Sequence, residues 1–563
     1  MILSKYWKLW IGLIILTYFF AVGVDTMDQD ASQYASMSRE MKESGNYLQV
    51  YEQEQDYLDK PPFLFWMNAL SMQLFGENNF AFKFPSILFA ILAIFCTYKL
   101  ASIYYEEELA RIAAFVIAGS QAIFLITNDI RTDTMLMGWV SLALWLLTKW
   151  FKEGGIKYFL YGCMAIGGGM ITKGPIALLV PVFALGSQLL MQRRWNYLFR
   201  KEYLYGVVII LLILTPMCIG LYQQFDLHPE KTMYGKPGTS GLRFFFWTQS
   251  FGRITGESVW DNGAPFSFLF ENLLWGFLPW TFLMVGGLIA GLIYLIKSKF
   301  KLNAGQEGLT IAGFTITYAS LASSNYQLPH YIYVVLPLLA IITAKFIFKI
   351  FTEKNKIRSY FCVLQYFILI LLSIFPAVIL IYVFPTKSIL IWLLAIIPAF
   401  TVLIYLIKFK TETYKLMSAS VLMIVLVNIF ISLWFYPQLL TYQSGNVAGR
   451  KVDALKVSKD AFYTYRYPGS TRNIHFYSKR IVTTIEQPFL MDKDIYVLTG
   501  AEGLSIIQQQ KNAFEVILKG EDFPVSQLTA EFLNVKTRSK TTTPYYFVKI
   551  KPFRSSFNLN LKS

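Results

Sequence analysis

Five ionisable residues that lie far apart in the chain are of the types that move protons or bind phosphate: Asp30, Lys60, Asp133, Lys173 and His330. A carboxylate or an imidazole can accept a proton, and a lysine is a compact positive charge for a phosphate group. Once the long apolar stretches are counted off, all five residues fall in loops on one side of a membrane. Polar groups at the ends of apolar helices are typical of a site open to both lipid and water.

The composition excludes an ordinary soluble enzyme. Of the 563 residues, 55% are hydrophobic, 17% aromatic and only 15% charged. A helix needs about 20 apolar residues to cross a hydrocarbon core of roughly 30 Å. The first apolar stretch has no small-x-small cleavage pattern before Asp25, so we interpret it as a retained signal-anchor helix. We count thirteen candidate spans: 6–24, 84–104, 110–127, 134–149, 157–172, 175–191, 204–223, 267–296, 309–323, 331–348, 359–383, 386–407 and 415–436.

The net charge of +16 suggests nucleic-acid binding at first sight, but its distribution excludes this function. With the N-terminus inside, Lys and Arg recur in the inside loops, which is the positive-inside pattern of membrane proteins. The short outside loops hold little beyond Arg131, Lys173 and Lys387. The basic residues therefore orient the chain in the membrane. The inside loops include Lys5, Lys8, Lys99, Arg111, Lys149, Lys152, Lys157, Arg193, Arg194, Arg200, Lys201, Lys297, Lys299 and Lys301.

The chain divides into a transmembrane domain over 1–438 and an outside domain over 439–563. In the outside domain we predict strands at 481–485, 494–498, 514–518 and 545–550, and a helix at 503–512, which indicates a small α/β fold. The fold class is therefore mainly α, with about thirteen transmembrane helices and a soluble C-terminal domain.

Two outside loops of the transmembrane domain are long. In the loop 25–83, the segment Ser32–Glu43 is amphipathic and Phe63–Phe75 is apolar but too short to span, so we expect both helices to lie along the membrane interface. The loop 224–266 is rich in Gly, Trp and Phe, and its composition suits a lid over a cavity.

The first acidic cluster follows the first span directly, in a segment that reads D-A-S-Q-Y from Asp30 to Tyr34. One interpretation is that an acidic residue in the first turn of a helix stabilises that helix by a few tenths of a kcal/mol. The alternative is a carboxylate at the membrane surface that accepts a proton from an incoming nucleophile.

Basic residues recur at short outside turns. In Asp59-Lys60-Pro61-Pro62 the prolines block a helix and fix Lys60 at the surface, although an interfacial lysine can also simply extend toward water. Two aspartates and an arginine, Asp129, Asp133 and Arg131, lie between two closely spaced spans, where they could pair and cap a helix or form part of a site. Lys173 precedes Gly-Pro on the face where lysine is scarce, so with Lys60 and Arg131 it would form a cationic pocket beside two carboxylates.

Taken in order, these segments resemble the membrane glycosyltransferases of the GT-C fold. The resemblance is to the bacterial branch that contains the lipid A aminoarabinose transferase and the protein-O-mannosyltransferase-like enzymes, and it covers residues 1 to about 345. The matching segments are D-A-S-Q-Y (30–34), D-K-P-P with F-L-F-W (59–66), L-F-G (74–76), R-T-D-T-M-L (131–136), G-G-G-M-I-T-K-G-P (167–175), Q-S-F-G-R (249–253), L-P-W (278–280) and Q-L-P-H-Y (327–331).

The resemblance implies a donor in which a sugar is joined through phosphate to a polyprenol, and transfer at the outer face of the inner membrane. It implies that Asp30 and Asp133 are the catalytic carboxylates. Lys60, Arg131 and Lys173 would bind the donor phosphate. Tyr34, Arg253 and His330 would line the substrate pocket. The acceptor stays open between lipid A, another glycolipid or glycan, and a protein, because both a hydroxyl and a phosphate acceptor fit these residues.

The resemblance also raises the question of a divalent metal ion. Some relatives carry Glu before the lysine and His three residues before the proline of the long loop, and these residues can hold a metal. Here the positions are Asp59 and Asn262. Asp59 could ligate, but Asn is a poor zinc ligand, so no cofactor is established and a metal at Asp59 stays an open alternative.

Two other classes of function compete with a transferase. A transporter or flippase of lipid-linked sugars would use many spans and a phosphate pocket, but it predicts polar residues near the middle of the bilayer. The spans here are almost free of charge, and the polar residues gather at one end. A membrane scaffold that displays the C-terminal domain would leave Lys60, Asp133 and Lys173 without a role.

Overall fold

The computed structural model describes residues 7–258, 260–353, 357–408, 412–510 and 512–552. The chain forms two compact units. Unit 1 consists of Met1–Gly23, Glu40–Ala377 and Ser388–Leu433, and unit 2 of Val24–Arg39, Val378–Lys387 and Trp434–Ser563. Unit 2 therefore contains a segment of the first long loop in addition to the C-terminal region.

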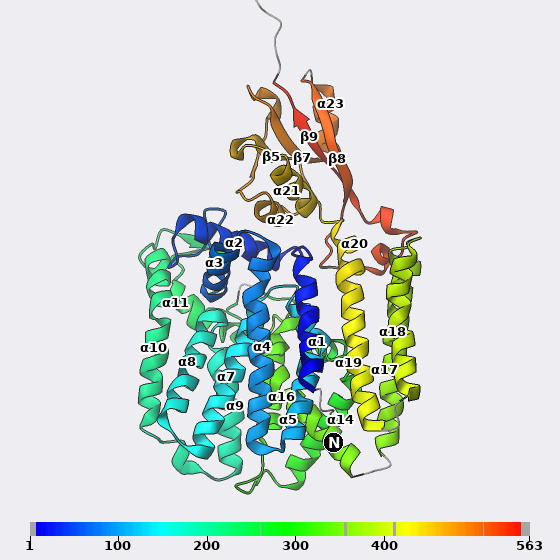
Figure 1. Cartoon of the computed structure of the whole chain (residues 1–563). Helices are drawn as coiled ribbons and strands as arrows, with labels where there is room; N and C mark the ends of the chain where they lie inside the picture. Colours follow the sequence, from blue (N-terminus) through cyan, green and yellow to red (C-terminus); the bar gives the residue numbers. More distant parts are fainter. Residues whose placement is uncertain (1–6, 259, 354–356, 409–411, 511, 553–563) are drawn as a thin grey trace, which may run out of the picture. The chain divides into compact units, whose positions relative to one another are not determined.

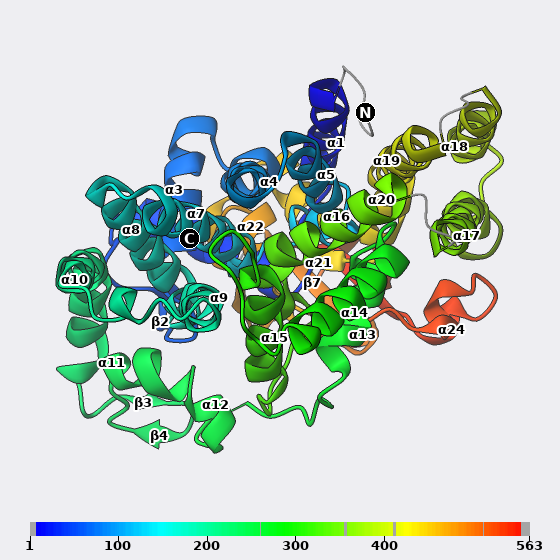
Figure 2. The same ribbon diagram turned by 90° about the horizontal axis from the view of Figure 1, so that it is seen from below.

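Unit 1 is built from helices that run side by side, as Figure 1 shows along their length and Figure 2 shows end-on. The central helix α7 packs against α4, α8 and α9. The helices are α1 (Trp7–Phe20), α3 (Phe63–Phe75), α4 (Asn79–Tyr104), α5 (Glu107–Ala118), α6 (Gln121–Ile126), α7 (Thr132–Glu153), α8 (Ile156–Lys173), α9 (Ile176–Met191), α10 (Glu202–Leu221), α13 (Phe268–Gly276), α14 (Thr281–Lys297), α15 (Leu309–Ala322), α16 (Leu336–Thr352), α17 (Ile357–Val378), α18 (Ile389–Lys408) and α19 (Glu412–Phe430).

Glycines let α7 and α8 approach each other closely. A Cβ atom added to Gly168 of α8 would lie 2.7 Å from the ring of Trp139 in α7, and one added to Gly169 would lie 3.3 Å from the Cβ of Trp139. Small residues at such positions are the usual means by which membrane helices pack tightly. The G-G-G motif therefore holds the end of α8, with Lys173, beside the start of α7, with Asp133.

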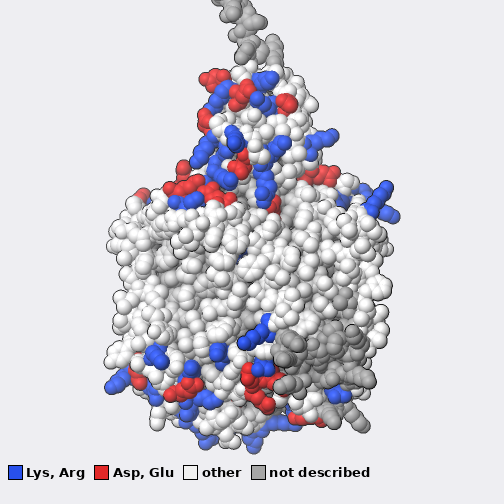
Figure 3. Space-filling model, viewed as in Figure 1, with Lys and Arg blue, Asp and Glu red and all other residues white. Residues whose placement is uncertain are grey.

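Six helical segments among the described residues are long and apolar enough, by length and composition, to cross a membrane: Asn79–Tyr104, Thr132–Glu153, Trp195–Asp226, Pro329–Thr352, Ile357–Val383 and Leu416–Leu440. Figure 3 shows a band on one face of unit 1 that is nearly free of charged side chains, with Lys and Arg, interspersed with Asp and Glu, along its lower rim. Such a band fits a hydrocarbon environment. The chain is thus a mainly helical, multi-pass membrane protein, and the count of thirteen spans stays a prediction.

Two predicted spans are broken in the structure. The stretch 267–296 forms α13 and α14, which are separated by Phe277–Trp280 with Pro279, a residue that cannot continue a helix. The stretch 110–127 forms α5 and α6 on either side of Gly119. Helix α2 (Asp30–Ser44) differs from the expected amphipathic helix at a lipid surface, since residues 31–41 are all buried.

The second long loop of unit 1 is largely folded. It contains the hairpin of β3 (Thr232–Met233) and β4 (Lys236–Pro237), followed by α11 (Gly241–Arg243) and α12 (Gly252–Thr255). A small aromatic cluster, in which Phe225 and Phe244 are buried and Trp260 packs against them, holds this loop together. A shorter hairpin in the first loop pairs β1 (Tyr51–Glu52) with β2 (Gln55–Asp56). The second loop positions residues of the candidate site.

Unit 2 contains a five-stranded sheet in the order β6-β5-β7-β9-β8. Strand β5 pairs in parallel with β6 and β7, whereas β9 pairs antiparallel with β7 and β8. The strands are β5 (Phe462–Tyr465), β6 (Thr483–Thr484), β7 (Ile495–Gly500), β8 (Phe514–Asp522) and β9 (Thr543–Ile550), and the helices are α20 (Tyr436–Leu440), α21 (Ser444–Ala454), α22 (Arg472–Tyr477), α23 (Ala501–Gln509) and α24 (Ala530–Leu533).

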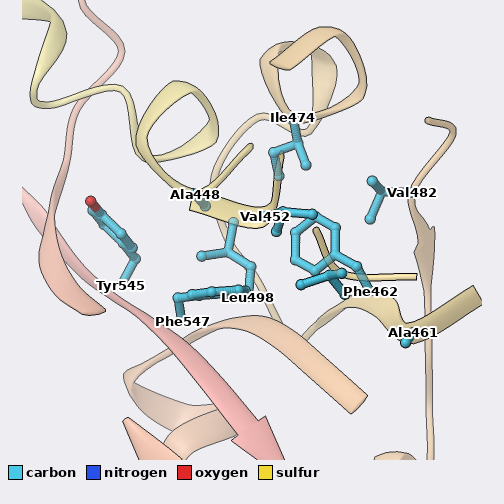
Figure 4. Close-up of a cluster of buried hydrophobic side chains, with 10 residues drawn as sticks. Ala448, Val452, Ala461, Phe462, Ile474, Val482, Leu498, Tyr545 and Phe547 are labelled. Atoms are coloured by element: carbon cyan, nitrogen blue, oxygen red, sulfur yellow. The ribbon is translucent and has the colours of Figure 1, made fainter. Parts of the chain in front are cut away.

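The core of unit 2 lies on both faces of this sheet. On one face, Val452 of α21 and Ile474 of α22 pack against Phe462, Leu498 and Phe547 of the sheet (Figure 4). On the other face, Ile507 of α23 packs with buried residues of β5, β7 and β9. The four predicted strands and the predicted helix all appear in the structure, whereas β5, α21 and α22 had not been predicted.

Candidate functional site

The first charged pair of the candidate site lies in the turn before α3. The Nζ of Lys60 donates a hydrogen bond to Asp59 Oδ2 at 2.7 Å. From the second long loop, the Gln249 side-chain amide donates to Asp59 Oδ1 at 2.7 Å and to the Asp59 carbonyl. Pro61 and Pro62 carry the chain directly into α3, which fixes this turn. The turn therefore holds Asp59 and Lys60 rigidly as a pair.

The environment keeps both groups of this pair ionised. Burial alone would raise the pKa of Asp59, but the Lys60 ammonium and the Gln249 amide hold it below its ordinary value. Burial alone would lower the pKa of Lys60, yet the charge of Asp59 holds it above its ordinary value. An opposite charge in hydrogen-bond contact outweighs desolvation here.

A second pair joins the start of α7 to the end of α8. Lys173 donates a hydrogen bond to Asp133 Oδ1, and the side chains are only 17% and 2% exposed. On the other side of the carboxylate, the Nε2 of His330 lies 3.7 Å from Asp133 Oδ2. Gly174 follows with a φ of +124°, a conformation that favours glycine, and Pro175 begins the turn into α9. This turn holds Lys173 against Asp133.

Arg253 of α12 contributes a guanidinium group in which one N–H donor has no acceptor among the described residues. Its Nη1 donates to the hydroxyl of Tyr331 at 2.8 Å. The guanidinium carbon lies 5.4–5.6 Å from the ring centres of Trp260, Tyr326 and Tyr331. The Nε atom is buried and finds no acceptor among the described residues. A buried donor without a partner costs about 1–3 kcal/mol, so an anionic ligand here would be stabilised.

Further charged and ionisable side chains lie near the two charged pairs and Arg253. Arg131 pairs with Asp129 at 2.9 Å between Nη2 and Oδ2. Lys173 lies 4.1 Å from the ring centre of Tyr331, the residue that also accepts from Arg253. His330 is within electrostatic range of Lys60, Arg131 and Lys173. The site thus gathers four cations and three carboxylates at one end of the helices, with one positive charge in excess.

The structure brings together Asp59, Lys60, Arg131, Asp133, Lys173, Arg253 and His330 of the predicted site residues, all in unit 1. Asp30 and Tyr34 belong to unit 2, in α2. There Asp30 begins the helix, and Tyr34 is buried. Their predicted roles in the substrate site stay predictions.

Three contributors were missed as functional residues. Gln249 and Tyr331 lie within the motifs Q-S-F-G-R and Q-L-P-H-Y, so the motifs carried the signal, but only Arg253 and His330 were selected from them. Asp129, the partner of Arg131, was considered only as a pairing or capping residue. The pairing alternative is correct for this residue.

The residues present do not fit a bound divalent metal. Among the described residues no group of three or more His, Cys, Asp or Glu side chains could hold one. Asp59 is occupied by Lys60 and Gln249, and the Asn262 amide bonds the backbone of Gln327 in both directions, at 2.8 and 3.1 Å. We therefore derive no role for a metal from these residues.

Comparisons with known proteins agree with this architecture. Residues 59–219 match the family model described as dolichyl-phosphate-mannose-protein mannosyltransferase. The chain is 26% identical over 338 residues to an undecaprenyl phosphate-alpha-4-amino-4-deoxy-L-arabinose arabinosyl transferase from Proteus mirabilis, a match that covers 59% of this chain and 57% of the relative. It is 28% identical to one from Edwardsiella ictaluri over 58% of this chain and 56% of the relative.

The fold comparison covers almost the whole chain. The crystal structure of ArnT from Cupriavidus metallidurans bound to undecaprenyl phosphate superimposes with a TM-score of 0.70, covering 96% of this chain and 97% of that chain at 16% identity. This chain has the GT-C fold. Its sequence resembles the aminoarabinose transferases, although it spans only somewhat more than half the length of the curated relatives named above. The GT-C resemblance predicted from the motifs is confirmed.

Proposed function

We propose that this chain is an integral-membrane glycosyltransferase that moves a sugar from a polyprenyl-phosphate donor to an acceptor at the outer face of the inner membrane. The observation that carries the proposal is the buried cluster with an excess positive charge, in which Arg253 Nε has no acceptor among the described residues. The names of the relatives point to an aminoarabinose-like pentose as the sugar. Lipid A, another glycan or a protein are the candidate acceptors.

Lys60 and Arg253 would bind the phosphate that leaves with the lipid. Lys60 uses one of its three N–H donors on Asp59, and Arg253 uses Nη1 on Tyr331. The remaining donors can meet phosphate oxygens. As the glycosidic bond breaks, negative charge grows on the phosphate, and fixed cations in a water-poor site stabilise that charge. Tyr331 and Trp260 hold the guanidinium in place.

Asp133 and Lys173 would act as a second charged unit. Both oxygens of Asp133 face cations or imidazole, since Oδ1 accepts from Lys173 and Oδ2 lies near His330. A carboxylate held in this way orients Lys173 beside Tyr331. Arg131, held by Asp129, would add positive charge to the donor phosphate from the same end of the helices. We retain Asp133 as the second carboxylate required for turnover.

Asp30 is the proposed base for an acceptor that is a hydroxyl. Such an acceptor must lose a proton during attack, and a positioned carboxylate contributes roughly 10²–10⁴-fold. A phosphate acceptor is already ionised near neutral pH, with a second pKa of about 6, and needs positioning more than a base. The effect of removing this carboxylate therefore distinguishes the two acceptor classes.

The test is to incubate the purified full-length chain with a panel of polyprenyl-phosphate sugars and to measure free polyprenyl phosphate by mass spectrometry. We expect release with at least one sugar, and release about tenfold to a hundredfold slower in Arg253→Gln. A transporter would move the donor across the bilayer without cleaving it. Transbilayer movement without cleavage, for every sugar and acceptor in the panel, would contradict a transferase.

A further inference from the structure

An apolar cavity of about 290 Å³ lies among α7, α8, α9 and α10 of unit 1. Helix α7 begins at the candidate site with Thr132 and ends at Glu153, and the cavity is lined by Trp150 near that second end. Helix α9 supplies one wall, with Leu178, Val182 and Leu189, and α8 and α10 supply others. The cavity thus extends from Leu178, in the first turn of α9, to Leu189 near the end of that helix, and no residue of the candidate site lines it.

The shape of the cavity suits a lipid chain. The lining residues of α9 extend from Leu178 to Leu189, which at about 1.5 Å per residue is about 16 Å along the helix axis. This is about half of a hydrocarbon core of roughly 30 Å. The hydroxyl of Tyr203, a polar group of the lining, is already bonded to the Tyr197 carbonyl. An apolar cavity of this kind does not hold ordered water.

Two guanidinium groups lie close to the cavity. Those of Arg194 and Arg200 lie 4.8 and 4.2 Å from the ring centre of Tyr197, and that of Arg200 is also 5.1 Å from the ring centre of Trp150. Among the described residues, Glu202 is the carboxylate within 4.0 Å of Arg200, and none is within that distance of Arg194. Positive charge is therefore in excess beside an apolar cavity.

The same segment has the residues of a membrane-interface anchor. Trp195 is 55% exposed and Phe199 is 88% exposed. Exposed aromatic residues beside Lys and Arg are typical of the level of the lipid head groups. This places the two guanidinium groups where the phosphate of a membrane lipid lies, with the cavity extending into the apolar layer below it.

We propose that this cavity binds one anionic phospholipid of the bilayer. One acyl chain would occupy the cavity, and Arg194 and Arg200 would bind the head-group phosphate through their paired N–H donors. The excess positive charge favours an anionic over a zwitterionic lipid, as for basic pockets between transmembrane helices. The proposal does not rest on the transferase activity, because no residue of the candidate site lines the cavity and Arg194 and Arg200 follow the end of α9 that is remote from Lys173.

The experiment is native mass spectrometry of the full chain in detergent, titrated with phosphatidylglycerol or with phosphatidylcholine of the same acyl chains. We expect one phosphatidylglycerol to bind at least tenfold more tightly than phosphatidylcholine. In R194Q/R200Q this preference is lost. The matched control K297Q/K301Q removes two exposed charges from the same end of unit 1 and keeps the preference.

A second variant fills the cavity. A Cβ at Gly186, which lines the cavity, meets no atom within 4 Å, so Gly186→Phe places a ring in open space. Gly12→Phe, at another open helical glycine, is its control. We expect Gly186→Phe to lose the bound lipid and Gly12→Phe to retain it.

Equal binding of the two lipids by the unaltered chain, or full retention of phosphatidylglycerol by Gly186→Phe, would overturn the proposal. Displacement of phosphatidylglycerol by an equimolar amount of polyprenyl phosphate would also overturn it, because the cavity would then belong to the donor lipid. R194Q/R200Q changes two half-buried residues without adding bulk to the cavity, so the test stands even where Gly186→Phe does not fold.

Discussion

The two ends of the helices of unit 1 carry the same types of charged residue in opposite environments. At the candidate site, the side chains of Lys60, Arg131 and Lys173 are 14–17% exposed, and each is paired with a carboxylate. At the other end, Lys297 and Lys299 are exposed to solvent. Exposed lysines orient a membrane protein at little cost, whereas buried cations cost desolvation energy.

The end of unit 1 away from the candidate site also has a charged pair that is largely buried, Lys345 with Glu307. Lys345 donates to Glu307 at 3.0 Å, and Glu307 also accepts from the backbone N–H of Thr310 at the start of α15 and from the hydroxyl of Tyr105. This pair links three helices, and its carboxylate is fully engaged. At the candidate site, by contrast, Arg253 retains an unused donor. Burial of a charged pair alone therefore does not indicate function, whereas an unused donor of a buried guanidinium that lies among further cations favours an anionic ligand.

The largest effect is expected from Asp30→Asn. The substitution is nearly isosteric and removes only charge and basicity, so folding is retained. With a hydroxyl acceptor, transfer should fall by roughly 10²–10⁴-fold, the usual contribution of a general base. The measurement is the rate of product formation per folded molecule with the identified acceptor. Near-normal transfer to a hydroxyl would show that another residue is the base.

Arg253→Gln should reduce transfer by about tenfold to a hundredfold. A charge-assisted hydrogen bond is worth about 1.5–3 kcal/mol, and about 1.4 kcal/mol corresponds to tenfold in rate. Arg253→Lys should restore only part of the loss, because an ammonium lacks the planar fork and the Nε donor. Full restoration by lysine would show that charge alone suffices and that the unused Nε plays no part.

The pH dependence of kcat/KM in Asp59→Asn tests whether the charge of Lys60 at the candidate site takes part in the reaction. The charge of Asp59 holds the pKa of Lys60 above its ordinary value, and burial opposes this. In Asp59→Asn the opposing carboxylate charge is gone, so burial lowers the pKa of Lys60. The alkaline decline in kcat/KM should therefore begin at a lower pH than in the unaltered chain. Asp129→Asn is the control, since Asp129 pairs with Arg131. An identical profile in Asp59→Asn would remove Lys60 from the reaction.

The smallest effect on activity is expected from Glu307→Gln, at the other end. Burial alone would raise the pKa of Glu307, but Lys345 and the hydrogen bonds from Tyr105 and Thr310 hold it below its ordinary value. The carboxylate thus stabilises the fold above its ordinary pKa of about 4.3, and this contribution is lost as the pH falls below it. We expect a melting temperature lower by a few degrees at neutral pH and unchanged transfer per folded molecule. A tenfold loss of transfer would contradict the assignment of this pair to stability.

Much of the site could be predicted from the sequence because its residues lie at fixed turns. The Pro-Pro after Lys60 and the Gly-Pro after Lys173 restrict the backbone locally, so these lysines could be assigned to one end of the spans. The partners could not be assigned. Gln249 reaches Asp59 across 190 residues, and only the packing of the second long loop on unit 1 creates that contact.

In the fold, too, local sequence patterns predicted individual helices and strands, whereas contacts between distant segments could not be predicted. Long apolar stretches predicted the helices, and short strand-like runs predicted four strands of unit 2. Strand β5 was missed because Phe462–Tyr465 is buried at three of its four residues and lacks a polar face. The segment Val24–Arg39 was assigned to the transmembrane domain, but it groups with unit 2. There Thr26 bonds Tyr477 and Asp28 bonds Gln443, contacts across more than 400 residues.

The most direct test of the central claim compares Lys60→Ala with Lys345→Ala. Each variant removes a lysine from a partly buried pair, one at the candidate site and one at the opposite end of unit 1. The measurement is the release of free polyprenyl phosphate per folded molecule from a donor that the unaltered chain cleaves. We expect Lys60→Ala to lose about tenfold to a hundredfold and Lys345→Ala to retain the activity of the unaltered chain. Equal activity of the two variants would contradict the assignment of Lys60 to the donor phosphate.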